Sequence, residues 1–136
     1  MLQVDSDRGL LFRILRTAQL AWIGDLAAAS LLLEVETWPK PGLVSQVDCG
    51  SHGDMDAGTF RAGAEALHPF FVALASAGGT GMDESRAIGL LAEEAMMAVT
   101  GGVNTHRGAM AGRPNTPDVT LYLQTLTWRH RQLTAI

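Results

Sequence analysis

Residues 101–108 combine flexible backbone with an amide, a hydroxyl, an imidazole and a guanidinium, in the order Gly101-Gly102-Val103-Asn104-Thr105-His106-Arg107-Gly108. The glycines allow positive φ or a close approach to a ligand, and Asn104 or Thr105 is a suitable helix N-cap. Free N–H groups at such a helix start, with His106 and Arg107 beside them, suit a phosphate. The alternative is a glycine stop after one helix, followed by the N-cap of the next.

A second chemically rich stretch is His52-Gly53-Asp54-Met55-Asp56. In a loop, Asp54 and Asp56 could both reach one Mg²⁺ ion, which prefers carboxylates together with substrate phosphate oxygens. Glu34 and Glu36 end a predicted helix where they oppose its dipole, so one of them is a further candidate ligand. In the alternative interpretation Asp56 is an N-cap, Asp54 forms a turn, His52 is a surface residue, and the two glutamates belong to a solvated helix end.

Three further basic features need an interpretation. Lys40 stands between two prolines, so its charge lies on a stiffened loop where it can meet a phosphate, although an ordinary exposed lysine fits equally well. His68 lies beside Pro69 on an apolar face and is assigned a structural role. The basic run 128–131, which contains His130, is compatible with nucleic acid in principle, but an acidic chain favours a solvated surface.

The composition indicates one globular domain that contains mainly helix. A length of 136 residues fits a single domain, 1–136. A content of 47% hydrophobic residues indicates a folded chain and argues against disorder. A net charge of −4 gives no long-range attraction to nucleic acid or to an anionic membrane. The single cysteine, Cys49, favours the cytoplasm. Asp25 argues against both a signal peptide and a membrane-spanning helix in the apolar N-terminal region.

Apolar residues at three- and four-residue steps predict the helices that position these side chains. The first helix covers about 10–35, with Ser6 or Asp7 as its cap, and ends at the prolines of 37–42. A loop of about 20 residues then runs from Thr37 to about Asp56; loops of this length are usually functional or disordered, and its His, Asp and Gly content favours function.

Two more helices follow this loop. Asp56 is a plausible cap for the second helix, Pro69 should kink or divide it, and it ends at 78–81; its apolar positions are Phe60, Ala64, Leu67 and Phe71. The third begins at Asp83 as cap, has Glu93 and Glu94 off its apolar face, and ends before Gly101; that face holds Ile88, Leu91, Ala92, Ala95, Met96 and Val99. Residues 113–117 form a turn, and 119–133 are either helix or strand. The predicted fold is an all-α, single-domain helical bundle with a long functional loop between the first two helices.

Three motifs together resemble one family, the triphosphoribosyl-dephospho-coenzyme A synthases that serve citrate lyase and malonate decarboxylase. The resemblance covers about 26–110 in the correct order, and its specificity comes from three separated motifs. They are Glu34-Val35-x-Thr37-x-Pro39-Lys40-Pro41-Gly42-Leu43-Val44, then Gly50-x-His52-x-Asp54-Met55-Asp56, and finally Glu93-x-x-Met96-x-x-x-Thr100-Gly101-Gly102-Val103-Asn104-Thr105-His106-Arg107-Gly108-Ala109.

The resemblance implies a transferase that joins ATP to dephospho-coenzyme A and releases adenine. A ribose hydroxyl attacks the anomeric carbon of ATP's ribose, and the oxocarbenium-like transition state needs carboxylates near the sugar and a donor near the base. His106 would act as acid or base from an ordinary pKa near about 6.5. The implied roles are catalysis by Asp54, Asp56, Glu93 and His106, substrate binding by Lys40, His52, Gly101, Gly102, Asn104, Thr105 and Arg107, and Mg²⁺ binding by Asp54, Asp56 and Glu34.

The chain also departs from this family. Members commonly have Lys at the position of Arg107, and residues 111–136 form a divergent C-terminal tail where the family continues with more helices. Two alternatives therefore accompany the transferase hypothesis. One is a non-catalytic helical remnant that homo-oligomerises to cover exposed apolar faces, and the other is a metal-dependent phosphohydrolase built on the His-x-Asp-x-Asp cluster.

Overall fold

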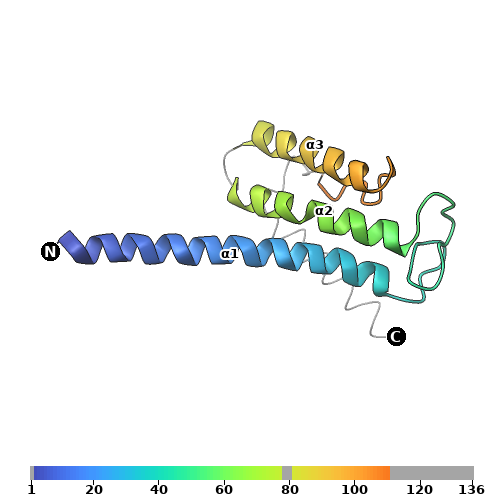
Figure 1. The fold of residues 1–136 in the computed structure, drawn as a ribbon, viewed down its shortest axis with the longest axis horizontal. Helices are drawn as coiled ribbons and strands as arrows, with labels where there is room; N and C mark the ends of the chain where they lie inside the picture. The colour runs from blue at the N-terminus through green and yellow to red at the C-terminus, as the bar shows by residue number, and fades with distance from the viewer. Residues whose placement is uncertain (1, 78–80, 111–136) are drawn as a thin grey trace.

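A computed structural model describes residues 2–77 and 81–110, with the side chains of 2–8 left out. This part of the chain contains three helices, α1 (Leu2–Glu36), α2 (Ala57–Ser76) and α3 (Met82–Val99). Figure 1 shows α2 lying between α1 and α3, and α2 packs against both. The all-α prediction is confirmed. The predicted turn at 113–117, the segment 119–133 and His130 lie outside the described residues.

The observed helix boundaries confirm some predictions and correct others. The loop between α1 and α2 runs from Thr37 to Asp56, as the two prolines and the change of pattern predicted. By contrast, α1 begins at Leu2, so Ser6 and Asp7 lie inside the helix and do not cap it. The N-cap position of α3 is Gly81, and Asp83 lies in the first turn, where its charge complements the helix dipole. Pro69 does not divide α2.

The core lies where the second half of α1 meets α2 and where α2 meets α3. Small residues allow the helices to approach closely: a Cβ added to Gly24 would lie 2.3 Å from Val72 Cγ2. The predicted apolar face of α3 is only half buried, because Leu91 and Val99 are exposed. The buried core residues are Ala27, Leu31, Ala64, Leu67, Phe71, Ala92 and Met96.

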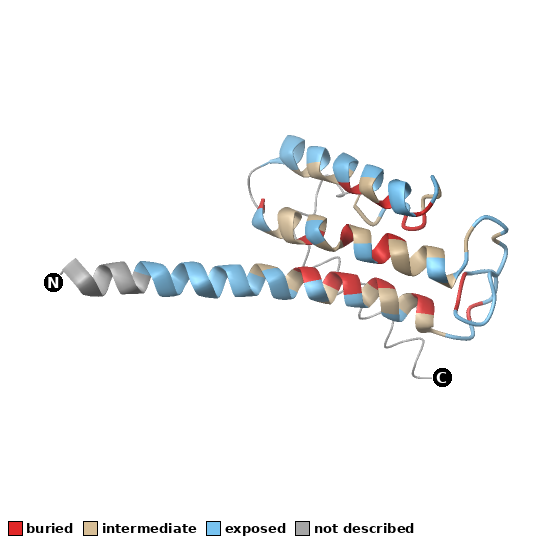
Figure 2. Ribbon diagram, in the orientation of Figure 1, coloured by how far each residue is buried: buried red, intermediate tan, exposed pale blue. Residues whose placement is uncertain are grey.

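The first half of α1 extends beyond the other helices (Figure 1), and its described side chains are exposed to solvent (Figure 2). These exposed side chains include Leu10, Leu11, Phe12, Ile14 and Leu15. By length and composition alone, Gly9–Glu36 is apolar enough to cross a membrane. Core helices of globular proteins and signal sequences share those two properties, so they do not assign this helix to a membrane.

Two polar pairs join α1 to α2. Asp25 Oδ1 lies 2.7 Å from His68 Nε2, and Glu36 forms an ion pair with Arg61. His68 therefore has a partner in the neighbouring helix, which agrees with the structural role predicted for it. The pairing of Glu36 likewise ties the end of α1 to α2, so this glutamate is not simply part of a solvated helix end.

The loop of 37–56 is organised by its own hydrogen bonds. The backbone N–H of Ser45 donates to the Asp48 carbonyl at 2.9 Å, and the Ser45 hydroxyl accepts from the N–H of Asp48 at 3.2 Å. The N–H of Ser51 donates to the Gly42 carbonyl at 3.1 Å. Val44 and Ser45 are buried. The loop thus has a defined conformation in which its second half, with His52 and Asp54, is brought back beside its first half.

Asp56 is the N-cap of α2, as the sequence suggested in one of its two interpretations. Its Oδ1 accepts hydrogen bonds from the Thr59 N–H at 2.7 Å and from the Thr59 hydroxyl at 2.9 Å. These bonds favour the ionised carboxylate and hold the pKa of Asp56 below its usual value. Its carboxylate is therefore used at the helix terminus, where negative charge also complements the dipole.

Replacing Asp56 with alanine should lower Tm by roughly 5 °C, because it leaves N–H groups of the first turn of α2 without a side-chain acceptor. Asp54→Ala is the matched control, since this exposed carboxylate does not cap a helix. Thermal unfolding followed by far-ultraviolet circular dichroism measures both variants. Equal Tm values for the two variants would contradict the capping role.

Candidate functional site

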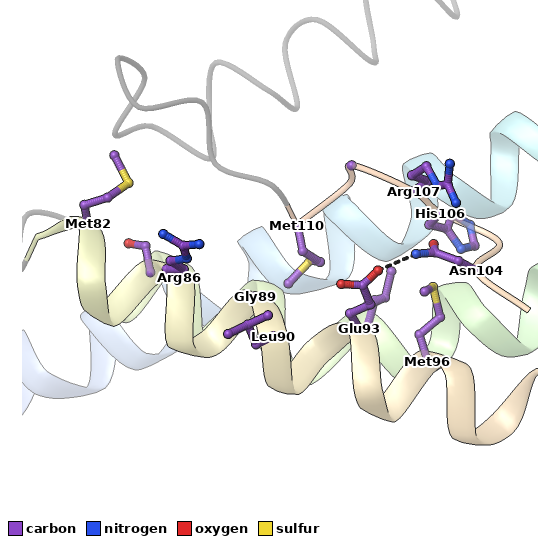
Figure 3. Close-up of a pocket in the computed structure, with 13 residues that line it drawn as sticks. Met82, Arg86, Gly89, Leu90, Glu93, Met96, Asn104, His106, Arg107 and Met110 are labelled. Atoms are coloured by element: carbon purple, nitrogen blue, oxygen red, sulfur yellow. Dashed lines mark hydrogen bonds between the residues drawn. The ribbon is translucent and has the colours of Figure 1, made fainter. Parts of the chain in front are cut away.

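Two adjoining cavities lie around residues 103–108. The larger one, of about 600 Å³, is bounded by α3 and the segment after it (Figure 3). The smaller one, of about 490 Å³, lies where the end of α1, the 37–56 loop and the start of α2 meet residues 103–107. Both volumes are typical of small-molecule sites. Asn104 and Arg107 line both cavities.

The smaller cavity brings together side chains from all three sequence motifs. Glu34 comes from the end of α1, His52 and Asp54 from the loop, and residues 103–107 from the segment after α3. Asp54 Oδ1 lies 3.8 Å from His52 Nδ1. Apolar groups complete the wall, and the full lining is Glu34, Leu43, Val44, His52, Asp54, Met55, Phe60, Val103, Asn104, Thr105 and Arg107.

The glycines at the end of α3 stop this helix. Gly101 and Gly102 have φ of 67° and 87°, and the N–H of Gly102 donates to the Met97 carbonyl at 2.8 Å, a typical helix C-terminal arrangement. No helix begins between residues 101 and 110, so the predicted phosphate-binding helix start at Asn104 or Thr105 is wrong. A Cβ on either glycine would meet nothing within 4 Å, so positive φ is what requires glycine there. Neither glycine lines either of the two cavities described above.

The side chain of His106 is buried, and the residue lines the larger cavity. Its Nδ1 lies 2.8 Å from the Thr105 hydroxyl, and its ring centroid lies 4.2 Å from that of Phe60. Burial lowers its pKa to about 4, so the ordinary value expected from the sequence does not hold. His106 is therefore neutral at pH 7, and its Nε2 is buried without a hydrogen-bond partner.

Gly63 is a site residue that the sequence analysis did not identify. It lies in α2 directly under the Thr105–His106 pair: an added Cβ would be 2.2 Å from Thr105 Oγ1 and 3.2 Å from His106 Nδ1. A glycine inside a helical pattern was the available signal, because such glycines often mark close packing. Phe60, one turn earlier, was predicted only as a core residue, and it also lines the smaller cavity.

Asn104 holds Glu93 at the rim of the larger cavity. Its Nδ2 donates to Glu93 Oε1 at 2.5 Å, the contact marked in Figure 3. Periodicity left Glu93 and Glu94 equivalent, and both are exposed. The contact with Asn104 and the position at the cavity distinguish Glu93. The remaining amide atom, Asn104 Oδ1, is buried without a partner.

Lys40 closes the C-terminal end of α1. Its Nζ donates to the Glu34 carbonyl at 2.5 Å and lies 2.8 Å from Glu34 Oε1. Only 8% of Lys40 is exposed, so the interpretation as an ordinary exposed lysine is wrong. It lines neither cavity, and phosphate binding by Lys40 stays a prediction. A cation at this helix end interacts favourably with the dipole and offsets the unfavourable position of Glu34.

The carboxylates predicted to bind Mg²⁺ have different surroundings. Asp56 caps α2 and lines neither cavity, whereas Asp54 and Glu34 line the smaller one. Across residues 2–77 and 81–110, no three His, Cys, Asp or Glu side chains are grouped to hold a metal ion. One or two carboxylates suffice for Mg²⁺ that arrives with a phosphate ligand. The residues therefore fit an ion carried by a nucleotide, which Asp54 and Glu34 would contact.

Comparison with known proteins decides the family. Residues 20–111 match the family of ATP:dephospho-CoA triphosphoribosyl transferases, a span that includes both cavities. The chain belongs to this family. The resemblance of the three motifs is thereby confirmed. The transferase match begins close to where α1 becomes buried, so the exposed first half of α1 lies mostly outside it.

Several relatives of this transferase family are similar over the same region. A probable 2-(5''-triphosphoribosyl)-3'-dephosphocoenzyme-A synthase of Albidiferax ferrireducens is 46% identical over 96 residues, which are 65% of this chain and 32% of the relative. A protein of the same name from Vibrio cholerae is 45% identical over 94 residues, 63% of this chain and 30% of the relative. A 2-(5''-triphosphoribosyl)-3'-dephosphocoenzyme-A synthase of Haemophilus ducreyi is 43% identical over 96 residues, 65% and 30% of the two chains.

This member of the transferase family spans about a third of the length of the curated relatives it matches. No solved structure gives a significant match.

Proposed function

We propose that this chain binds ATP and takes part in transferring its triphosphoribosyl group to dephospho-coenzyme A. The names of the relatives and the activity of the family support this reaction. The observation that carries the proposal is the smaller cavity, in which side chains from three separated motifs line one space. A cytoplasmic location belongs to the same proposal and agrees with the free, exposed Cys49.

The proposed reaction exchanges one bond at the anomeric carbon. The bond between that carbon and adenine breaks, a bond to a hydroxyl oxygen of dephospho-coenzyme A forms, and the hydroxyl proton is finally taken up by adenine. The triphosphate stays intact. Because positive charge develops on the sugar, a nearby carboxylate stabilises the transition state more than the ground state. The product would be the prosthetic-group precursor for the acyl carrier protein of citrate lyase or malonate decarboxylase.

The smaller cavity has side chains suited to the ribose of ATP and side chains suited to its triphosphate. Asp54 and Glu34 are the carboxylates that would face the ribose or the Mg²⁺ of the nucleotide. A bound Mg²⁺ would supply charge neutralisation on the triphosphate. Arg107 is exposed and lines both cavities, which suits it to the phosphates between them. His52 lies beside Asp54 and provides a second group that can contact phosphate oxygens.

Arg107→Ala should weaken binding of Mg²⁺-ATP about tenfold or more, because a charge-assisted hydrogen bond to phosphate is lost. Arg16→Ala is the matched control, since it removes an exposed arginine from the part of α1 that lies away from both cavities. Isothermal titration calorimetry measures the affinities, and adenine release in the presence of dephospho-coenzyme A measures the reaction. Unchanged ATP affinity in Arg107→Ala would contradict the proposal.

A second candidate function is self-association without catalysis, favoured by the row of exposed apolar side chains in the first half of α1. Such a surface is typically covered in an assembly. The partner would be a second copy of the chain, and Leu11→Glu should then reduce the solution mass measured by light scattering. A dimer that binds no nucleotide would support this candidate over the transferase.

A further inference from the structure

Two buried polar atoms without partners belong to residues that line the larger cavity. They are His106 Nε2 and Asn104 Oδ1. A buried polar atom without a hydrogen bond is unfavourable, and nearly all such atoms in folded proteins have a partner. Two of them on residues adjoining one cavity therefore point to a ligand that forms hydrogen bonds with both.

The orientation of both side chains is fixed by their other contacts. Asn104 uses its Nδ2 to donate to Glu93, so its Oδ1 is left as an acceptor (Figure 3). His106 uses its Nδ1 for the contact with Thr105, and Gly63 lies so close beneath that the pair has no space to move toward α2. When the Thr105 hydroxyl donates to Nδ1, the neutral ring carries its proton on Nε2 and is a donor there. The two groups are thus preorganised for binding.

The rest of the larger cavity suits a flat ring. Leu67, Leu90, Met96 and Met110 give it apolar walls beside the polar end formed by 104–107. Met82 and Met110 appear on the same side of α3 as Glu93 in Figure 3. Methionine sulfur packs favourably against aromatic rings. A cavity with apolar walls and a few fixed polar groups is typical of a site that recognises a heteroaromatic ligand.

We propose that the larger cavity holds the adenine ring of ATP, with Asn104 Oδ1 accepting from the exocyclic amino group and His106 Nε2–H donating to a ring nitrogen. This inference rests on the proposed function. Adenine carries an amino donor next to a ring-nitrogen acceptor, which complements this acceptor and donor pair. The two residues shared with the smaller cavity, Asn104 and Arg107, allow the ribose and phosphates to continue into it.

The arrangement also gives His106 a defined part in the reaction. As the bond to the sugar breaks, its electron pair moves onto adenine, and a fixed N–H directed at a ring nitrogen stabilises the charge that develops there. Burial keeps the ring of His106 neutral at pH 7. It therefore assists the leaving base by donating a hydrogen bond, and the proton that adenine finally takes up comes from the attacking hydroxyl through solvent.

Binding of three probes to the full chain tests the proposal: ATP, purine riboside 5'-triphosphate, which lacks the amino group, and tripolyphosphate, each with Mg²⁺. Unaltered chain should bind ATP about tenfold to hundredfold more tightly than purine riboside triphosphate, since the latter leaves Asn104 Oδ1 unpaired. In Asn104→Leu the two nucleotides should bind equally. Glu94→Ala is the matched control and should keep the preference, because Glu94 is exposed and lines neither cavity.

The three probes separate failure of this inference from failure of the proposed function. Equal binding of ATP and purine riboside triphosphate by the unaltered chain would overturn the adenine assignment, whatever the folding of the variant. If tripolyphosphate also binds and Arg107→Ala abolishes its binding, the phosphate part of the proposed function survives that result. If none of the three probes binds, both proposals are overturned.

Discussion

Gly63→Ala is expected to destabilise the chain by about 1–3 kcal/mol and to weaken ATP binding, because the new methyl group has no space. It would lie 2.2 Å from Thr105 Oγ1 and 3.2 Å from His106 Nδ1, so the Thr105–His106 pair must move away from α2. That movement changes the position of Asn104, which lines both cavities, and of His106, which lines the larger one. Packing loss outweighs the roughly 1 kcal/mol that alanine gains over glycine in a helix.

Gly9→Ala is the control, because Gly9 also lies in a helix but a Cβ there meets nothing within 4 Å. This variant should be unchanged or more stable by up to about 1 kcal/mol, since only the helix propensity differs. Urea unfolding measures both free energies, and ATP titration measures binding. Equal stability of Gly63→Ala and the unaltered chain would show that the Thr105–His106 segment does not depend on close contact with α2.

The helices and the loop were predictable because their signals are local. Prolines ended α1 at the observed place, and apolar spacing located α2 and α3. Burial depends on the neighbouring helices, and there the predictions were less accurate. Leu91 lies on the apolar face of α3 yet is 57% exposed, whereas Ala92, its neighbour in sequence, is fully buried against α2. Periodicity identifies a face but does not show how much of it another element covers.

The sequence indicated which residues lie at the candidate site better than it indicated which partner each of their side chains has. Three motifs indicated side chains that the fold does place around one cavity, including Asp54 and Asn104. Which carboxylate serves which purpose depends on distances between elements. Asp56 is used as a helix cap, Glu34 lines the cavity and is also paired with Lys40, and Asp54 lines the cavity beside His52. Sequence spacing alone leaves the three equivalent.

His106 should make folding stability depend on pH between about 6.5 and 4. Burial lowers the pKa of the folded chain's His106 to about 4, whereas the unfolded chain has the ordinary value near 6.5. Between these values the unfolded state binds the extra proton, so the free energy of unfolding falls as the pH is lowered. The loss begins as the pH falls below about 6.5 and reaches about 3 kcal/mol once the pH is below about 4.

Measuring the free energy of unfolding against pH for His106→Gln and for the unaltered chain separates the contribution of His106 from that of other titratable groups. The variant should lose the decrease in unfolding free energy between pH 6.5 and 4, and the acid-sensitive contribution of Asp56 should remain, because its lowered pKa acts only below the usual carboxylate value of 3.8. The NMR chemical shift of His106 Cε1–H reports its protonation directly. A midpoint near about 6.5, with parallel stability curves for both chains, would mean that the imidazole is solvated and does not lie packed against Phe60.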